Sequence, residues 1–344
     1  MFKKKNYTLF FIVGVVCTLI IAGVVFLNKN FAPVSNDNSQ IALKILPGDS
    51  FNMIVSQLKE KELIKNKLAF KILAILSGKA HQIKPGEYLL NRSLSSREII
   101  KILVKGPEEI AVTIIPGKTL KEIDDLLSKN KIIQKGELIN LDINTVYLTN
   151  PSKYFFLENK KTLEGFLLPD TYRFLTGESP KNVAFKILDN FLEKALPILE
   201  KDDKIEENRE ILYQDLILAS CVEKEVPVFE DQKIAAGILK KRLEIGMPLQ
   251  VDATVLYAKC DGRFNNCSSL RGSDLKIDSP YNTYLFKGLP PAPISNPAIS
   301  TIEAVINSTD SPYLYYLSVP NTNITIFSKT LEEHNHNRLQ YLSK

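Results

Sequence analysis

An uncharged apolar segment near the N-terminus constrains this chain more than any other feature. Residues 7–27, YTLFFIVGVVCTLIIAGVVFL, contain no charged side chain. As a helix, a segment of this length rises about 30 Å, which matches the hydrocarbon core of a bilayer. Lys3–Lys5 precede the segment, and only Lys29 follows it closely. Because positive charge favours the cytoplasmic side, the pattern predicts a cytoplasmic tail at residues 1–6, a transmembrane helix at 7–27 and an extracytoplasmic chain beyond it.

A cleaved signal peptide is the alternative interpretation of this segment. The apolar region of a signal peptide is normally shorter, and no clear small-x-small cleavage site follows Leu27. We therefore expect an uncleaved single-pass anchor. In an extracytoplasmic compartment Cys260 and Cys267, which flank DGRFNN, can form a disulfide. Two free thiols on a polar loop are the alternative, and the sequence leaves this choice open.

Length and composition exclude some classes of protein. The chain has 344 residues, enough for two or three domains, and 44% hydrophobic residues support real cores rather than disorder. A net charge of +5 does not by itself indicate a nucleic-acid partner, and the outward location argues against one. Only His334 and His336 have a metal-like spacing, and no third ligand stands out. We expect no metal and no cofactor.

An internal repeat follows a polar linker at residues 28–40. Residues 43–64 (LKILPGDSFNMIVSQLKEKELI) align without gaps on residues 112–133 (VTIIPGKTLKEIDDLLSKNKII). Each copy reads as a short strand, a Pro-Gly turn and a helix, with Ser50 or Thr119 at the N-cap position. Such units are consistent with a purely structural role or with ligand binding.

Between the two copies lies another strand and capped helix, with Ser95 or Ser96 as the cap. We therefore predict a small α+β module at residues 41–135 and a weakly patterned connector at 136–160. From residue 161 polar, proline and tyrosine clusters alternate with two helices, at about 206–226 and 230–245. This pattern predicts a larger α+β domain at residues 161–344, built around a central helix.

Two acids end the first of these helices. An apolar run, Leu216–Val222, leads directly into Glu223. Apolar walls and the negative end of the helix dipole both raise the pKa of a carboxyl at that place, which suits a general acid. Glu225 lies about 200° further around the helix, so the two acids face different directions. The alternative is that both are solvated helix-end acids.

Residues 218–258 (LASCVEKEVPVFEDQKIAAGILKKRLEIGMPLQVDATVLYA) closely resemble the MltG (YceG-like) family of endolytic murein transglycosylases. In that family ASxVEKE leads into RLxxGMxLQxDxTVxY. Further similar stretches follow the family's order and spacing: EGFLLPDTY (164–172), SPYNTY (279–284), GLPPAPISNP (288–297), SPYLYYL (311–317) and EHN (333–335). The resemblance covers nearly the whole chain.

The resemblance implies a membrane-anchored enzyme with a LysM-like module at 41–135 and a catalytic domain at 161–344. The catalytic glutamate of the family maps onto Glu223. It would protonate the oxygen between N-acetylmuramic acid and N-acetylglucosamine, and then accept the proton of the muramoyl C6 hydroxyl as a 1,6-anhydro end forms. The expected partners are peptidoglycan strands, the bacterial inner membrane and peptidoglycan synthases (penicillin-binding proteins), with the bulk of the chain periplasmic and cutting of nascent strands limiting their length.

Seven motif residues are candidates for substrate binding, because amides, hydroxyls, carboxylates and phenol rings suit sugar recognition: Glu164, Gln250, Asp252, Thr254, Tyr281, Asn282 and Tyr284. Asp252 is equally consistent with capping the next helix through Thr254, and the tyrosines with half-buried structural roles.

Two positions depart from the family pattern. Ala298 stands where a glycine is usual, and Thr325 where a histidine often precedes the late phenylalanine. We expect neither change to touch Glu223. Two other functions stay open: a hydrolytic muramidase that pairs Glu223 with Asp252 or Glu164, and a non-catalytic glycan-binding scaffold.

Overall fold

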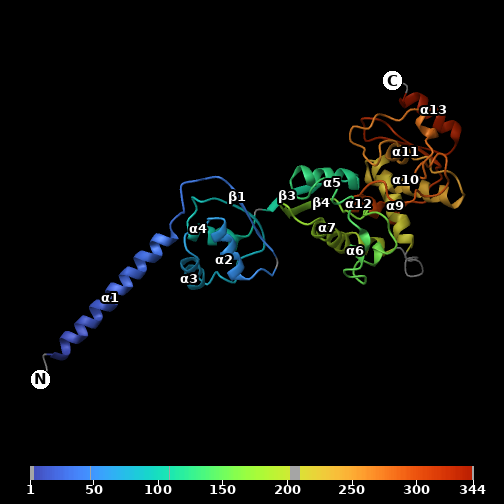
Figure 1. Cartoon of the computed structure of the whole chain (residues 1–344). Helices are drawn as coiled ribbons and strands as arrows, with labels where there is room; N and C mark the ends of the chain where they lie inside the picture. The colour runs from blue at the N-terminus through green and yellow to red at the C-terminus, as the bar shows by residue number, and fades with distance from the viewer. Residues whose placement is uncertain (1–3, 47, 108, 202–209, 343–344) are drawn as a thin grey trace. The chain divides into compact units, whose positions relative to one another are not determined.

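The computed structural model describes residues 4–46, 48–107, 109–201 and 210–342. The fold is α+β, as predicted, with many helices and three two-stranded sheets among these residues (Figure 1). The chain divides into two compact units, Met1–Glu109 and Ile110–Lys344. Each unit has a hydrophobic core of its own.

The first unit begins with helix α1 (Lys4–Phe31), which contains the apolar segment of the sequence. Its stretch Phe11–Phe31 has a mean hydropathy of 2.6, and none of the side chains described in this stretch is buried inside the protein. By length and composition this is a helix able to cross a membrane, which is compatible with the predicted anchor.

The rest of the first unit is a strand-helix-helix-strand-helix arrangement. Strand β1 (Ile41–Ile45) pairs antiparallel with β2 (Gly86–Leu90), and alternate residues of both strands enter the core. Helices α2 (Phe51–Glu60), α3 (Lys67–Leu76) and α4 (Ser96–Lys105) complete this core.

The predicted helix caps are present in this unit. The Oγ of Ser50 accepts a hydrogen bond of 3.3 Å from the backbone N–H of Met53. Of the two candidates for α4, Ser95 is the cap, and it forms a reciprocal capping box with Glu98. These bonds satisfy N–H groups that a helix start otherwise leaves without partners.

The second copy of the repeat lies in the second unit. It forms β3 (Glu109–Ile114) and α5 (Leu120–Lys129), which Thr119 caps as predicted. Strand β3 pairs with β4 (Asp170–Leu175), far along the chain. The expected module of residues 41–135 is therefore divided by the boundary after Glu109, because the partner strand of its second half belongs to the larger unit.

The second unit continues through helices and a terminal hairpin. In chain order its remaining elements are α6 (Ile143–Tyr147), the 3₁₀ turn η1 (Phe155–Leu157), α7 (Pro180–Lys194), α8 (Leu196–Leu199), α9 (Glu210–Glu225), α10 (Phe229–Glu244), α11 (Asp252–Lys259), η2 (Asp274–Lys276), α12 (Ile299–Ile306), β5 (Tyr315–Ser318), β6 (Thr325–Ser328) and α13 (Leu331–Leu342).

Helix α9 is central to this unit. It packs against α8, α10, α11 and α12, and it is apolar on nearly every side, with Leu216, Ala219 and Val222 fully buried. A helix that is hydrophobic all round belongs inside a core. The two helices predicted here are confirmed as α9 and α10, while residues 206–209 lie outside the described residues.

Candidate functional site

The last turn of α9 places its two acids in different surroundings. One oxygen of Glu223 accepts hydrogen bonds from the backbone N–H of Ala298 (2.9 Å) and from the hydroxyl of Thr301 (2.6 Å), both at the start of α12. Burial raises the pKa of Glu223, and these two bonds and the charge of Lys224 oppose the rise. Position 298 therefore contacts Glu223, but through a backbone N–H that a glycine would also supply, so the change to alanine leaves this contact in place.

The carboxylate of Glu225 reaches the start of α11 instead. Its Oε1 accepts a hydrogen bond of 3.0 Å from the backbone N–H of Ala253. Burial, followed by the negative charge of Asp252, raises the pKa of Glu225 to about 7, and the Ala253 bond opposes this. At neutral pH a large share of Glu225 is therefore protonated, which a general acid requires.

Glu225 lines a cavity of about 430 Å³. Gln250, Asp252 and Tyr284, three of the predicted binding residues, line the same cavity. The Tyr284 hydroxyl donates a hydrogen bond to Asp252. Glu223 is not among the described residues that line it. The cavity thus combines one partly protonated carboxyl with a second carboxylate, a phenol and an amide.

Asp252 does not cap α11. The N-cap residue of α11 is Val251, which has no capping side chain, and Asp252 is the first helical residue. The carboxylate of Glu225 satisfies the next N–H of that helix, at Ala253, in place of a local cap. The capping alternative for Asp252 is therefore wrong, and its carboxylate faces the cavity.

The other predicted binding residues do not line this cavity. Thr254 is fully buried, donates to the carbonyl of Val251 and contacts the hydroxyl of Thr283 at 2.9 Å. Asn282 is also fully buried, and its amide donates to the carbonyls of Leu275 and Ile277. Their hydrogen bonds shape the loops around the cavity.

Tyr281 is half-buried and packs against the ring of Tyr257, with centroids 4.9 Å apart. Glu164 is only 2% exposed. It accepts hydrogen bonds from the backbone N–H of Leu120 (2.8 Å), the amide of Asn296 (2.8 Å) and the hydroxyl of Tyr257 (3.1 Å). Burial raises the pKa of Glu164 to about 8. Through these contacts Glu164 holds together segments that are far apart in the sequence.

The cavity also contains residues that sequence reasoning did not select. Arg242, Arg271, His334 and Arg338 line it, together with several aromatic side chains. The EHN motif at 333–335 was a usable signal for His334, but its distance along the chain from Glu225 gave no reason to place the two together. No group of three or more His, Cys, Asp or Glu side chains that suits a metal ion occurs among the described residues.

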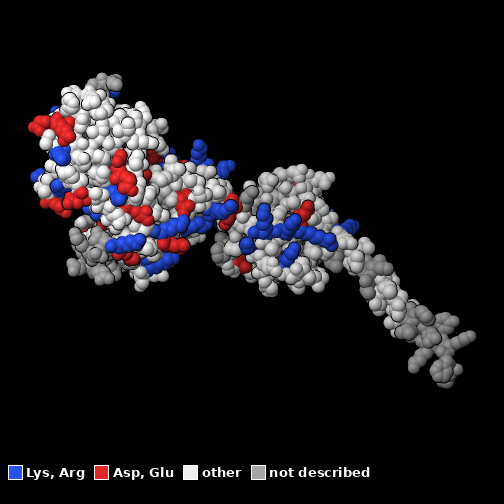
Figure 2. All heavy atoms as spheres, turned by 180° about the vertical axis from the view of Figure 1, so that it is seen from behind, with Lys and Arg blue, Asp and Glu red and all other residues white. Residues whose placement is uncertain are grey.

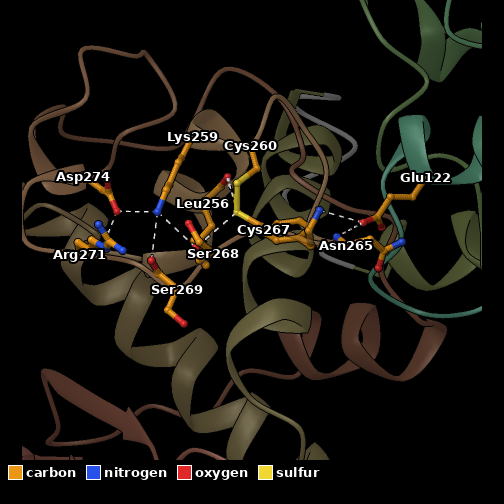
Figure 3. Close-up of a disulfide and its surroundings, with 11 residues drawn as sticks. Glu122, Leu256, Lys259, Cys260, Asn265, Cys267, Ser268, Ser269, Arg271 and Asp274 are labelled. Atoms are coloured by element: carbon orange, nitrogen blue, oxygen red, sulfur yellow. Dashed lines mark hydrogen bonds and ion pairs between the residues drawn. A yellow bond between two sulfur atoms is a disulfide. The ribbon is translucent and has the colours of Figure 1, made fainter.

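The disulfide left open by the sequence is present between Cys260 and Cys267 (Figure 3). On one side of the loop, the carboxylate of Glu122 on α5 accepts bonds from two backbone N–H groups of the loop, at 2.8 and 2.7 Å. On the other, Lys259 pairs with Asp274 at 2.7 Å and donates to carbonyls just after Cys267. This network holds the segment that carries Arg271 to the cavity wall.

Comparison with known proteins agrees with this architecture. A model of the YceG-like family matches residues 43–340. The chain is 32% identical to the endolytic murein transglycosylase of Bacillus subtilis strain 168, over 94% of this chain and 92% of that protein. It is 27% identical to the protein of the same name from Streptococcus pneumoniae, covering 90% of this chain and 60% of the other. The crystal structure of a putative yceG-like protein from Listeria monocytogenes aligns with a TM-score of 0.58 at 30% identity, covering 87% of this chain and 99% of that one.

Proposed function

The chain belongs to the YceG-like family, and we propose that it is an endolytic murein transglycosylase. It cuts the bond between N-acetylmuramic acid and N-acetylglucosamine inside nascent glycan strands and leaves a 1,6-anhydro muramoyl end, which limits strand length. The observation that carries the proposal is the cavity in which Glu225, with a pKa of about 7, stands beside Asp252 and Tyr284.

The reaction needs one carboxyl that gives a proton and then takes one. The acid transfers its proton to the glycosidic oxygen while the bond from that oxygen to muramoyl C1 breaks. The C6 hydroxyl of the same sugar attacks C1, and its proton goes to the carboxylate. The reaction consumes no water. The charge of Asp252 favours positive charge that develops at C1. Burial, and then the charge of Asp252, favour the protonated form of Glu225 at the start.

The geometry favours Glu225 over Glu223 as this acid. The resemblance places the catalytic role at Glu223, one oxygen of which accepts from Ala298 and Thr301 at the start of α12. Glu225 has a comparable backbone bond but lines the cavity. We therefore assign proton transfer to Glu225 and the positioning of α12 to Glu223.

Substitution of each acid tests this assignment. In the detergent-solubilised full chain, Glu225→Gln should lower the rate of cleavage of purified peptidoglycan by at least about a hundredfold, since loss of a general acid costs about 10² to 10⁴. Glu223→Gln, whose amide oxygen still accepts from α12, should stay within about tenfold of the wild type. The reverse ranking would return the catalytic role to Glu223.

Mass spectrometry of the new ends separates the rival functions. Anhydro-muramoyl ends support the transglycosylase, and reducing ends would identify a muramidase. A muramidase that pairs Glu225 with Asp252 fits the cavity, whereas Glu164 does not line it. A folded chain that binds strands and leaves them intact would be a scaffold.

The location and the first unit complete the proposal. We propose that α1 anchors the chain in the bacterial inner membrane, with its N-terminus cytoplasmic, and that the unit around β1 and β2 is a LysM-like module that holds the strand near the peptidoglycan synthases. The Cys260–Cys267 disulfide supports an oxidising, extracytoplasmic location. Protease added to intact spheroplasts should then digest the chain beyond α1; full protection would place it in the cytoplasm.

A further inference from the structure

The cavity that contains Glu225 carries an excess of positive charge. Three guanidinium groups line it: Arg242 on α10, Arg271 after the disulfide, and Arg338 on α13. Each comes from a different element, yet none forms an ion pair with a carboxylate among the described residues. Elsewhere in the second unit Arg263 has such partners, at Asp125 and Asp261.

Negative charge in the cavity does not balance these three cations. Its carboxyls are Asp252, which accepts the hydroxyl of Tyr284, and Glu225, which is partly protonated at neutral pH. Asp274, close to Arg271, is paired with Lys259 (Figure 3). On the face drawn in Figure 2, acidic and basic side chains are interspersed over the second unit, so no broad basic surface extends over that face.

The three arginines have different roles. Arg242 is 5% exposed, and its guanidinium donates to the carbonyls of Leu249 and Leu314 and lies over the ring of Tyr315, 5.0 Å from the centroid. It is a fixed structural cation. Arg271 and Arg338 are exposed at the cavity, with their guanidinium groups available to a ligand.

The pKa of a neighbouring histidine is lowered by the same positive charges. His334 stacks on Tyr315, and burial, Arg338 and Arg242 together lower its pKa, so the imidazole is neutral near pH 7. Its Nδ1 is buried and has no hydrogen-bond partner within the described part of the chain. The α13 side of the cavity thus combines cations with an unused polar atom, as a ligand site does.

Cleavage of the sugar backbone alone does not call for these cations. The two sugars of a glycan strand are neutral, whereas the peptide attached to the lactyl group of each muramoyl residue carries carboxylates. Guanidinium groups bind carboxylates through paired N–H donors. We propose that Arg271 and Arg338 form a subsite for the carboxylates of the muramoyl stem peptide, so that the enzyme selects peptide-bearing strands. This inference rests on the proposed function.

Paired substrates test the subsite. Glycan strands free of phosphate-bearing polymers are compared with strands from which an amidase has removed the peptides. The lactyl carboxylate that the amidase exposes is converted to a methyl amide, so that the bare strands carry no carboxylate. Both substrates are assayed with the full chain in detergent. The wild type should have a kcat/KM at least about tenfold higher on the peptide-bearing strands, as one or two charge-assisted hydrogen bonds provide. The Arg271→Gln/Arg338→Gln variant should lose this preference through a higher KM on the peptide-bearing strands, with a clearly smaller loss on the bare strands.

Arg173→Gln is the matched control. Arg173 is exposed, lies in the same unit on β4 and has no ion pair with a carboxylate among the described residues, but it does not line the cavity. It should leave both rates unchanged. Equal losses on both substrates in the double variant, or a wild type without preference, would overturn the subsite.

Binding separates a failed subsite from a failed function. The affinity for labelled strands is measured by fluorescence polarisation. The chains carry Glu223→Gln and Glu225→Gln, so that the strands are not cut, with and without the two arginine substitutions. Tighter binding of peptide-bearing strands that disappears with the arginines, and weakens as salt rises, supports the subsite even if no anhydro ends form. Equal binding of both strands overturns it, whatever the activity.

Discussion

The buried carboxyl of Glu164 should make the stability of this protein depend on pH. Its pKa is raised from 4.5 to about 8, first by burial and also by the nearby charge of Glu122. Between these two values the unfolded chain releases a proton that the folded chain keeps. The contribution is therefore fully present below pH 4.5 and is lost as the pH rises through 8.

The magnitude follows from the pKa change. One pKa unit corresponds to about 1.4 kcal/mol, so the loss between pH 4.5 and 8 is about 5 kcal/mol, with about 3 kcal/mol already lost at pH 7. Glu225 acts in the same direction over a narrower range, because its pKa rises to about 7. Both losses are large against the usual net stability of a domain, about 5–15 kcal/mol.

Glu164→Gln isolates the effect because the amide is nearly isosteric and does not ionise. Its oxygen still accepts from Leu120 and Asn296, and its NH₂ group can donate to the hydroxyl of Tyr257 in place of the present bond. At pH 4.5 the variant should be less stable than the wild type by about 1 kcal/mol. At pH 8.5 it should be more stable by a few kcal/mol, so the two stability curves cross.

Urea unfolding of the full chain in detergent, at half-unit steps from pH 4.5 to 8.5, measures the crossing. Tyr257→Phe is a matched variant, since loss of a hydrogen bond that favours the anion raises the pKa of Glu164 in the folded chain further. The loss of stability should then still begin near pH 4.5 but continue to a higher pH. Parallel curves for the wild type and Glu164→Gln across this range would refute the reasoning, because they would mean that Glu164 ionises alike in the folded and unfolded chains.

Two further predictions concern packing and the disulfide. A Cβ added at Gly237 on α10 would lie 2.0 Å from the carbonyl oxygen of Thr309, so Gly237→Ala should destabilise the chain by about 3 kcal/mol in urea unfolding, and a loss below about 0.5 kcal/mol would contradict this packing. Cys260→Ser/Cys267→Ser should cost about 2–3 kcal/mol for so short a loop. The same double substitution should also raise the KM for peptide-bearing strands, because the disulfide loop holds the segment that carries Arg271. An unchanged KM would mean that the bonds of Lys259 hold this segment without the disulfide.

Local signals in the sequence predicted local structure well. Ser50 and Thr119 cap the helices that the repeat predicted, because a cap depends on residues only two or three positions away. The extent of the first module could not be predicted in the same way. Strand β3 pairs with β4, which begins at Asp170, and no local pattern shows which distant strand completes a sheet.

The predicted binding residues fall into two groups, and local sequence could not separate them for a similar reason. Gln250, Asp252 and Tyr284 line the cavity, whereas Thr254 and Asn282 make buried hydrogen bonds that hold its loops. Polar residue types in a motif are equally suited to both tasks. What separates them is the direction of each side chain, which depends on packing from other parts of the chain.

The two acids of α9 show where sequence reasoning stops and packing decides. Two positions along a helix turn a side chain by about 200°, which predicts different surroundings for Glu223 and Glu225 but does not say which one meets a cavity. Each carboxylate accepts a backbone N–H at the start of another helix, α12 or α11, in a place where that helix has no side-chain cap of its own. The second carboxyl at the α11 end, Asp252, adds a repulsion to Glu225 that Glu223 lacks. The backbone contact is common to both acids, so the neighbouring charge of Asp252 is what distinguishes the electrostatic surroundings of Glu225 from those of Glu223.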